Sequence, residues 1–234
     1  MYLSRLHVDQ QSRAVRRDLG DLQALHRTIM SAFPATDRDA DAAGRVMWRL
    51  EAGDHRDHIV LLVQSTAAPD WSRLARGYLA DDHPEVKPID AVIAALAAGM
   101  SLRFRLVANP TVKIDTKSGP EGVRRNGRRV PLRGDEALLA WLVRKGADAG
   151  FTVGPDAAAA ARAVVVRPLG DLVGWRANDP GDGAQRLTLR GAAFDGVLTV
   201  TDADRLRAAV TSGIGSGKAY GFGLLSLAPM SAAR

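Results

Sequence analysis

The sequence predicts an α+β protein built from two tandem ferredoxin-like βαββαβ domains. Segments that alternate apolar and polar residues, as strands do, are separated by segments with apolar residues at helical spacing. The order strand, helix, strand, strand, helix, strand occurs once in each half of the chain, as in the split βαβ motif. The 234 residues are enough for one to two domains that bury their own cores.

The first domain is expected over residues 1–110. Its helices are expected at 18–33, which Asp18 caps and Pro34 ends, and at about 70–80. Short alternating or continuous apolar runs predict its four strands, at 2–8, 45–51, 58–65 and 101–108.

The second domain is expected over residues 130–234, after a basic linker at 111–129. The linker contains Asn126-Gly127, a strong turn signal, and we expect a loop or a hairpin there that marks the domain boundary. The helices are expected at 135–144 and 202–212, the latter capped by Asp202. The strands of this domain are expected at 130–132, 163–167, 186–189, 196–201 and 222–227.

The composition excludes several classes of protein. Hydrophobic residues make up 46% of the chain, which is too many for a disordered protein. No apolar run approaches the roughly 20 residues of a membrane helix, and the first residues lack a secretory signal core. There is no cysteine, which removes disulfides, thiolate metal sites and cysteine nucleophiles. We therefore expect a cytoplasmic protein with no membrane partner.

The positive charge is concentrated in one stretch. Nine basic and two acidic residues lie between Arg103 and Arg133, so this stretch has a net charge of +7 while the whole chain has +6. Such an uneven distribution indicates a polyanionic partner. The alternative is a solvated loop without a ligand. The candidate nucleic-acid contacts here are Arg103, Arg105, Arg124, Arg125, Arg128 and Arg129.

Five glycines fall within the eleven residues of Gly213–Gly223, in the run GIGSGKAYGFG. Glycine lets a backbone approach a phosphate closely, and Lys218 adds a positive charge, so Gly215, Gly217 and Lys218 are candidate RNA contacts. The run is not a P-loop, because Ala219 stands where a hydroxyl should bind magnesium and the loop follows a helix. A turn that binds no ligand is the alternative.

His26 is the histidine with the most suggestive surroundings. It follows Leu25 on the predicted helix and precedes Arg27, and an imidazole near a basic surface can transfer protons at neutral pH. The alternative is a histidine at the edge of the core. His55 and His58 lie in a turn without a third ligand at a familiar spacing, so we expect no metal site.

Several segments together resemble CasE, the repeat-processing endoribonuclease of type I-E CRISPR systems, from Met1 to about Pro229. The glycine-rich run alone is typical of the broader RAMP superfamily of RNA-binding proteins. Its combination with LHRT near the start and RxANP in mid-chain resembles CasE in particular. The segments are SRAVRRDLGDLQALHRTI (12–29), LRFRLVANP (102–110), RRVPL (128–132), AWL (140–142), FDGVLTVTD (194–202) and GIGSGKAYGFGLLSLAP (213–229).

The resemblance implies two RRM-like domains that bind the stem-loop of a CRISPR repeat. It implies cleavage at the base of the stem by attack of a 2′-hydroxyl, without metal or other cofactor, after which the protein stays on the RNA as a Cascade subunit. The family's catalytic histidine falls on His26. Some members have a tyrosine three residues earlier, where this chain has Gln23, so a tyrosine role does not carry over.

Two alternatives remain open at the level of sequence. One is a CasE-like subunit that binds repeat RNA without cutting it, because Gln23 departs from the family pattern. The other is a different RAMP-type protein that packs along guide RNA as a structural subunit and has little preference for a stem.

Overall fold

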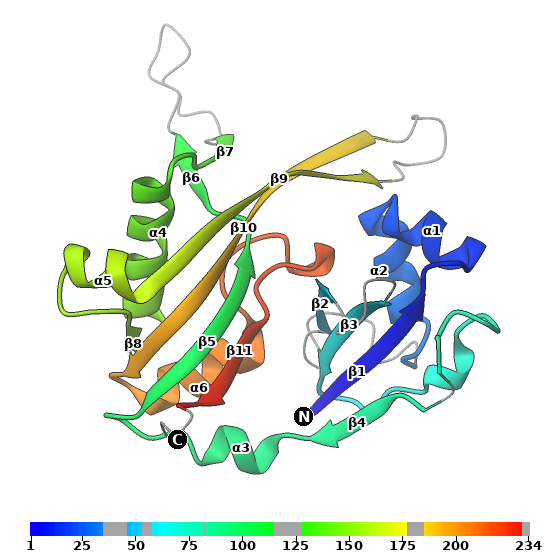
Figure 1. Ribbon diagram of the computed structural model, residues 1–234, viewed down its shortest axis with the longest axis horizontal. Coiled ribbons are helices and arrows are strands. Elements are labelled where there is room, and N and C mark those ends of the chain that lie inside the picture. The colour runs from blue at the N-terminus through cyan, green and yellow to red at the C-terminus, as the bar shows by residue number, and fades with distance from the viewer. Residues whose placement is uncertain (35–45, 53–57, 82, 115–127, 177–184, 231–234) are drawn as a thin grey trace, which may run out of the picture.

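Two antiparallel sheets lie side by side, each with helices on one face (Figure 1). The computed structural model describes residues 1–34, 46–52, 58–81, 83–114, 128–176 and 185–230. The faces that carry no helix are turned toward each other and share hydrogen bonds and an ion pair. Within the described residues no helix is both long and apolar enough to span a membrane.

The first sheet has the strand order β2-β3-β1-β4. Its strands are β1 (Tyr2–Asp9), β2 (Met47–Ala52), β3 (His58–Ser65) and β4 (Glu85–Pro88). Two helices cover it, α1 (Arg13–Leu19) and α2 (Leu22–Met30). The core between them is made by side chains that alternate along β1 and β3 and recur along α2, including Leu6, Leu61, Leu25, Ile29 and Phe33.

The second sheet has the order β11-β5-β10-β8, and β9 also pairs with β10. Its strands are β5 (Ser101–Ala108), β8 (Phe151–Thr152), β9 (Val164–Arg176), β10 (Gln185–Val200) and β11 (Leu225–Pro229). The helices α4 (Asp135–Asp148) and α6 (Ala203–Ser212) enclose the core with the sheet. Trp141 of α4 stacks on Phe194 of β10 at its centre, with 5.9 Å between the ring centroids.

In the first sheet β1 lies between β3 and β4, and in the second sheet β5 lies between β10 and β11 in the same way. This is the arrangement that a βαββαβ chain with two split crossovers produces, so the predicted fold class is confirmed. The remaining elements connect or extend this framework. They are the 3₁₀ turns η2 (Trp71–Arg73) and η3 (Lys218–Tyr220), the short helices α3 (Asp90–Ala94) and α5 (Ala157–Ala163), and the two-stranded hairpin of β6 (Thr111–Ile114) and β7 (Arg128–Pro131).

The domain boundary predicted after residue 110 is wrong. Strand β5, predicted as the last strand of the first domain, pairs with β10 and β11 of the second sheet. The first sheet ends instead with β4, which pairs with β1. All four residues of β4 are exposed, so it shows no apolar alternation by which the sequence could reveal it. The hairpin β6–β7 accordingly lies inside the second domain, between β5 and α4, and its residues 115–127 are outside the described part.

The helix predicted at 18–33 is two helices. Gly20 ends α1, and Asp21 then adopts an extended conformation and accepts a hydrogen bond from the Gln23 amide as the N-cap of α2. The helix predicted from Asp70 is only the 3₁₀ turn η2. Beyond it Gly77 has a positive φ of 72°, and the chain then pairs with β1. The cap at Asp21 and the positive φ at Gly77 are local features that the spacing of apolar residues does not reveal.

The strands predicted at 186–189 and 196–201 are parts of one strand, β10, which runs for 16 residues. Its partner β9 runs for 13 residues, well beyond the predicted 163–167. The register shifts between Gly191 and Ala192, where the pair bends. Beyond the bend, residues 170–176 and 185–190 form a two-stranded arm that reaches across to α1 and α2 (Figure 1). We call this segment the β9–β10 arm.

Candidate active site

His26 lies at the edge of the first core. Leu22, Leu25 and Ile29 point into that core and fix the rotation of α2, so that His26 is half-buried beside them. Its Nδ1 atom is buried and has no hydrogen-bond partner among the described residues. Burial lowers the pKa of the His26 imidazole below its ordinary value of 6.5. The imidazole is therefore neutral at neutral pH and able to accept a proton.

Helix α2 is packed between two elements of the second domain, η3 and β9. The indole Nε1 of Trp48 on β2 donates to the Ala219 carbonyl oxygen in η3 at 3.2 Å, and Tyr220 packs against the first core. On the other side, the Trp175 amide donates to Asp21 Oδ1 at 3.0 Å. The fold thus brings the predicted Lys218 segment and the predicted His26 helix together.

The glycine-rich run is built for close packing. Gly221 has a φ of +84°, and a Cβ atom there would lie 2.7 Å from the Trp48 ring. Gly215 lies against Trp141, and Gly217 lies against Phe222. These contacts explain Gly215 and Gly217 by packing within the second domain and Gly221 by packing between the domains, so a role of Gly215 and Gly217 in binding RNA stays a prediction.

Arg27 is exposed and lines a pocket beside α2. Two further arginines from different elements line the same pocket, Arg17 of α1 and Arg73 of η2. Arg17 is held by the buried Asp18, which also accepts hydrogen bonds from Thr28 and from the Tyr78 hydroxyl at 2.6 and 3.0 Å. Sequence reasoning missed Arg17 and Arg73, because neither lies in the basic stretch.

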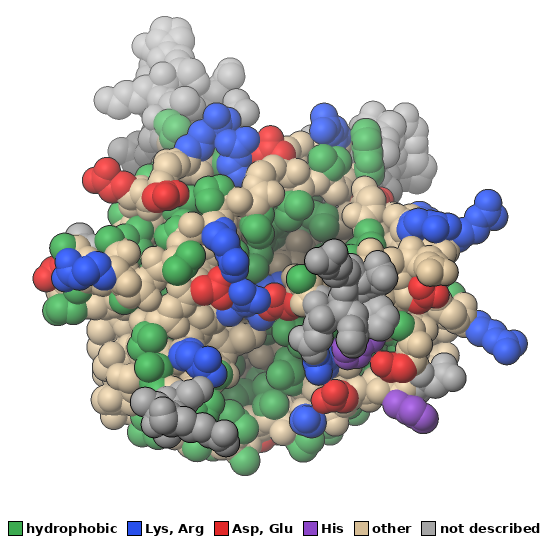
Figure 2. All heavy atoms as spheres, in the orientation of Figure 1, with side chains coloured by type: hydrophobic (Ala, Val, Ile, Leu, Met, Phe, Trp, Pro, Cys, Tyr) green, Lys and Arg blue, Asp and Glu red, His purple; other side chains and the backbone are tan. Residues whose placement is uncertain are grey.

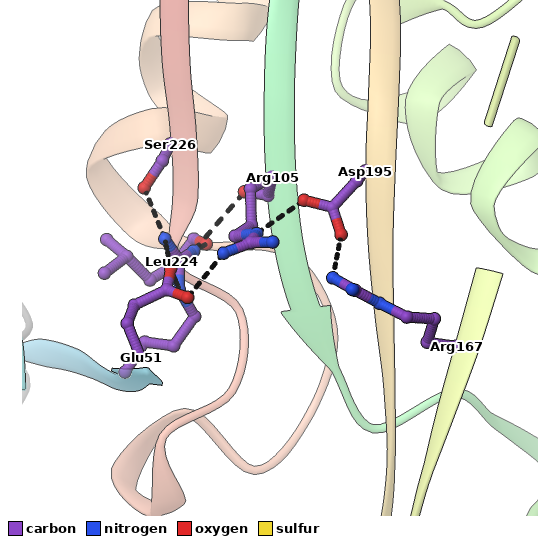
Figure 3. Close-up of polar contacts among 7 residues, drawn as sticks. Glu51, Arg105, Arg167, Asp195, Leu224 and Ser226 are labelled. Atoms are coloured by element: carbon purple, nitrogen blue, oxygen red, sulfur yellow. Dashed lines mark hydrogen bonds and ion pairs between the residues drawn. The ribbon is translucent and has the colours of Figure 1, made fainter. Parts of the chain in front are cut away.

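Arg103 and Arg105 lie on the face of the second sheet that carries no helix. The residues that they contact are distant in the sequence. Arg105 bonds to Glu51 of the first domain at 2.6 Å and to Asp195 at 2.5 Å, and Asp195 also bonds to Arg167 at 2.6 Å (Figure 3). The charge of Arg105 is thus already paired with two carboxylates. Its role in binding RNA stays a prediction, and the structure gives it a role in joining the domains.

Arg49 is the second connection at this interface, and only 3% of its side chain is exposed. It donates to the Leu224 carbonyl oxygen and to Ser226 Oγ of β11, each at 3.0 Å, and pairs with Glu51. Figure 2 shows this face, where basic and acidic side chains lie together in a central hollow. Sequence reasoning missed Arg49, because the sequence of a strand does not show what will contact a polar side chain on the face of the sheet that carries no helix.

The basic stretch is only partly described. Arg124 and Arg125 lie outside the described residues, as does the side chain of Arg128. Arg129 is exposed on β7, directly opposite Lys113 of β6. The part of the hairpin that the structure describes therefore presents two basic residues side by side. In the described ranges no three His, Asp or Glu side chains lie close enough to hold a metal ion.

The fold and these contacts define a protein of two ferredoxin-like domains with a histidine helix at their junction. The profile of the family described as CRISPR associated protein matches residues 1–229. The CRISPR-associated endoribonuclease Cse3 of Thermus thermophilus is 35% identical over 231 residues, 98% of this chain and 100% of that protein. The CRISPR system Cascade subunit CasE of Escherichia coli (strain K12) is 31% identical over 232 residues, which are 98% of this chain and 100% of that protein.

A solved structure of Cse3 bound to 19 nt RNA is similar to this fold, with a TM-score of 0.74 at 35% identity. The structural match covers 98% of this chain and 100% of the Cse3 chain. This chain belongs to the CasE family of CRISPR-associated proteins.

Proposed function

We propose that this protein is an endoribonuclease that cuts CRISPR precursor RNA at the base of the repeat stem-loop and then stays on the product as a Cascade subunit. It acts in the cytoplasm. The observation that carries the proposal is His26, a desolvated and neutral imidazole on a helix that both domains enclose. The similarity to Cse3 and to the Cascade subunit CasE, over nearly the whole of each chain, supports the substrate and the assembly.

In the proposed reaction the 2′-hydroxyl of one nucleotide attacks the adjacent phosphorus. The bond from phosphorus to the 5′-oxygen of the next nucleotide breaks, and that oxygen takes up a proton from solvent, which leaves a 2′,3′-cyclic phosphate and a 5′-hydroxyl. His26 acts as the general base that takes the proton of the 2′-hydroxyl, because a lowered pKa keeps its nitrogen unprotonated. The proposed reaction uses no metal, because His26 rather than a metal-bound hydroxide activates the 2′-hydroxyl.

In the proposed reaction, basic side chains offset the charge that develops on the phosphate oxygens. Arg27 follows His26 in the chain, but the pocket that Arg27 lines with Arg17 and Arg73 does not include His26. Guanidinium groups suit this task because their planar donors match phosphate oxygens. We assign Arg27 to a phosphate next to the one that is cut, and Lys218 to the same strand from the side of η3.

The hairpin β6–β7 supplies the contacts to the stem in this proposal. The deep, narrow major groove of an RNA helix does not admit side chains that read bases, so a stem is recognised by shape and by its phosphates. Lys113 and Arg129 form an adjacent pair of basic residues on the hairpin. The arginines at 124, 125 and 128 extend the same basic stretch.

The direct experiment is to incubate the pure protein with its host's repeat RNA in EDTA and to map the ends. We expect one cut at the base of the stem, a cyclic or 3′-phosphate end and a 5′-hydroxyl end. A 2′-deoxy substitution at the cut nucleotide should abolish the cut. Strict dependence on magnesium, or cleavage of the 2′-deoxy RNA, would contradict the proposed chemistry.

A further inference from the structure

Trp175 is the only exposed tryptophan of the four in the chain, all of which the structure describes. Its side chain is 47% exposed, whereas Trp48, Trp71 and Trp141 are at most 6% exposed. A large aromatic side chain normally contributes much of its area to a core. Trp175 instead lies on the β9–β10 arm, near the end of β9.

The arm holds Trp175 against the helix that carries His26. Its backbone amide donates to Asp21 Oδ1, the cap of α2. Its neighbour Gly174 lies against α2, where a Cβ atom would be 3.5 Å from the Leu22 Cβ. His26 is five residues beyond Asp21, roughly 7 to 8 Å along the helix axis. The position of Trp175 relative to His26 is therefore fixed by a direct contact between the domains.

The Trp175 ring shares its face of the arm with basic residues. Successive residues of a strand point to opposite faces, so the ring points away from the side on which Gly174 meets α2. Cross-strand partners share a face, and the partner of Trp175 is the exposed Arg186. Arg190 on the same face pairs with Asp171 at 2.7 Å, and Arg133 and Arg186 also lie close enough to lower the pKa of Asp171.

We propose that Trp175 is a stacking platform for one nucleobase of the bound RNA. An exposed ring that is flanked by cations, on a strand whose backbone amide is bonded to the cap of the histidine helix, has the chemistry of such a platform. This inference rests on the proposed function, because it takes the bound RNA as the ligand. Stacking does not read the base identity, so the platform positions the strand and tolerates any base.

The first test uses the tryptophan emission of the wild-type protein. The ligand is the repeat hairpin RNA with a 2′-deoxy nucleotide at the cut site, so that binding is followed without cleavage. Since the other three tryptophans are buried, quenching by added iodide reports mainly on Trp175. We expect the RNA to quench this emission and to protect it from iodide. Binding of the hairpin with no change in either signal overturns the inference.

The second test compares variants by their affinity for the same RNA. Trp175→Ala should weaken binding by about 5- to 100-fold, the range that loss of one aromatic stacking contact gives. Trp175→Phe should stay within about threefold of wild type. The matched control is Leu169→Ala, which removes a side chain of similar exposure from the same strand and should leave affinity unchanged. A Trp175→Ala protein that melts as wild type does and binds with wild-type affinity overturns the inference.

The third test locates the base that stacks on Trp175. It decides whether this base comes from the unpaired flank or from the terminal pair of the stem. Abasic nucleotides are introduced singly in the unpaired flank and in the terminal pair of the stem. One of them should weaken binding to the wild type and should cause no further loss in Trp175→Ala. Strictly additive losses at every position overturn the inference. If the wild type binds the hairpin but never cuts normal RNA, the proposed function fails while these three tests still decide the platform.

Discussion

Trp48 and Ala219, 171 residues apart, are joined across the two domains by a hydrogen bond of 3.2 Å from the indole Nε1 to the carbonyl oxygen. The bond fixes η3 on β2, and η3 in turn packs against α2. The position of Lys218 relative to His26 therefore depends on how the domains pack. Substitutions at the domain interface should change the catalytic rate even though they do not touch the RNA.

Replacing Gly221 by alanine should destabilise the protein by about 2 to 4 kcal/mol. A Cβ atom would meet the Trp48 ring at 2.7 Å, and the positive φ of 84° adds backbone strain. Gly77→Ala is the matched control, because Gly77 also has a positive φ but has nothing within 4 Å. Urea denaturation should show a loss of about 1 to 2 kcal/mol for the control. Equal losses in the two variants would contradict the close packing of Gly221 on Trp48.

Arg49→Ala should cost about 3 to 5 kcal/mol of unfolding free energy. The substitution removes the buried donor of the Leu224 carbonyl and of Ser226, and it leaves Glu51 with Arg105 as its remaining partner. The control is Arg167→Ala, which breaks a pair whose arginine side chain is 56% exposed and should cost less than about 1 kcal/mol. Thermal or urea unfolding measures both. A loss of unfolding free energy in Arg49→Ala no larger than that of the Arg167→Ala control would mean that other contacts hold the domain interface.

The pKa of His26 gives stability a dependence on pH. The folded pKa lies below the ordinary value of 6.5, so the unfolded state binds more protons in the window between the two values. The free energy of unfolding should therefore fall as the pH is lowered from 6.5 through that window. In His26→Ala this contribution is absent, so the wild type should lose stability relative to the variant on acidification. A difference between them that does not change from about pH 7.5 to 5.5 would count against a desolvated imidazole.

The basic stretch should set the salt dependence of RNA binding. Replacing Arg124, Arg125, Arg128 and Arg129 by alanine should weaken hairpin binding and reduce the log–log salt slope by about 0.7 to 0.9 for each lost phosphate contact. Arg144→Ala on α4, an exposed arginine outside this stretch, is the control and should leave the slope unchanged. If the quadruple variant binds as wild type does at every salt concentration, the RNA follows another path.

Elements with strong local signals could be predicted from the sequence. The apolar run of β3 predicts 58–65, and the capping side chain of Asp202 marks the start of α6, as the structure has them. What could not be predicted depends on contacts between distant residues. β5 looks like any alternating strand, and only its pairing with β10 and β11 assigns it to the second sheet.

The same limit applies to the candidate site. The pattern of the sequence singled out His26, Lys218 and the basic stretch, and the fold brings the first two elements together. The sequence pattern did not reveal that Arg105 would be paired with Asp195 and, across the domain interface, with Glu51. An ion pair between strands that are distant in the sequence leaves no periodic signal. Trp175 was missed for the same reason, because its importance comes from the bond of its amide to Asp21.

The central claim is that His26 performs the proton transfer in a metal-independent cut. It is tested most directly by the single-turnover cleavage rate of His26→Ala in EDTA, measured beside its affinity for the repeat hairpin. Loss of the general base should reduce the rate by about two to four powers of ten while affinity stays within a few-fold of wild type. His83→Ala, which removes an exposed histidine from outside α2, should cut at the wild-type rate. A His26→Ala protein that cuts nearly as fast as wild type would contradict the account.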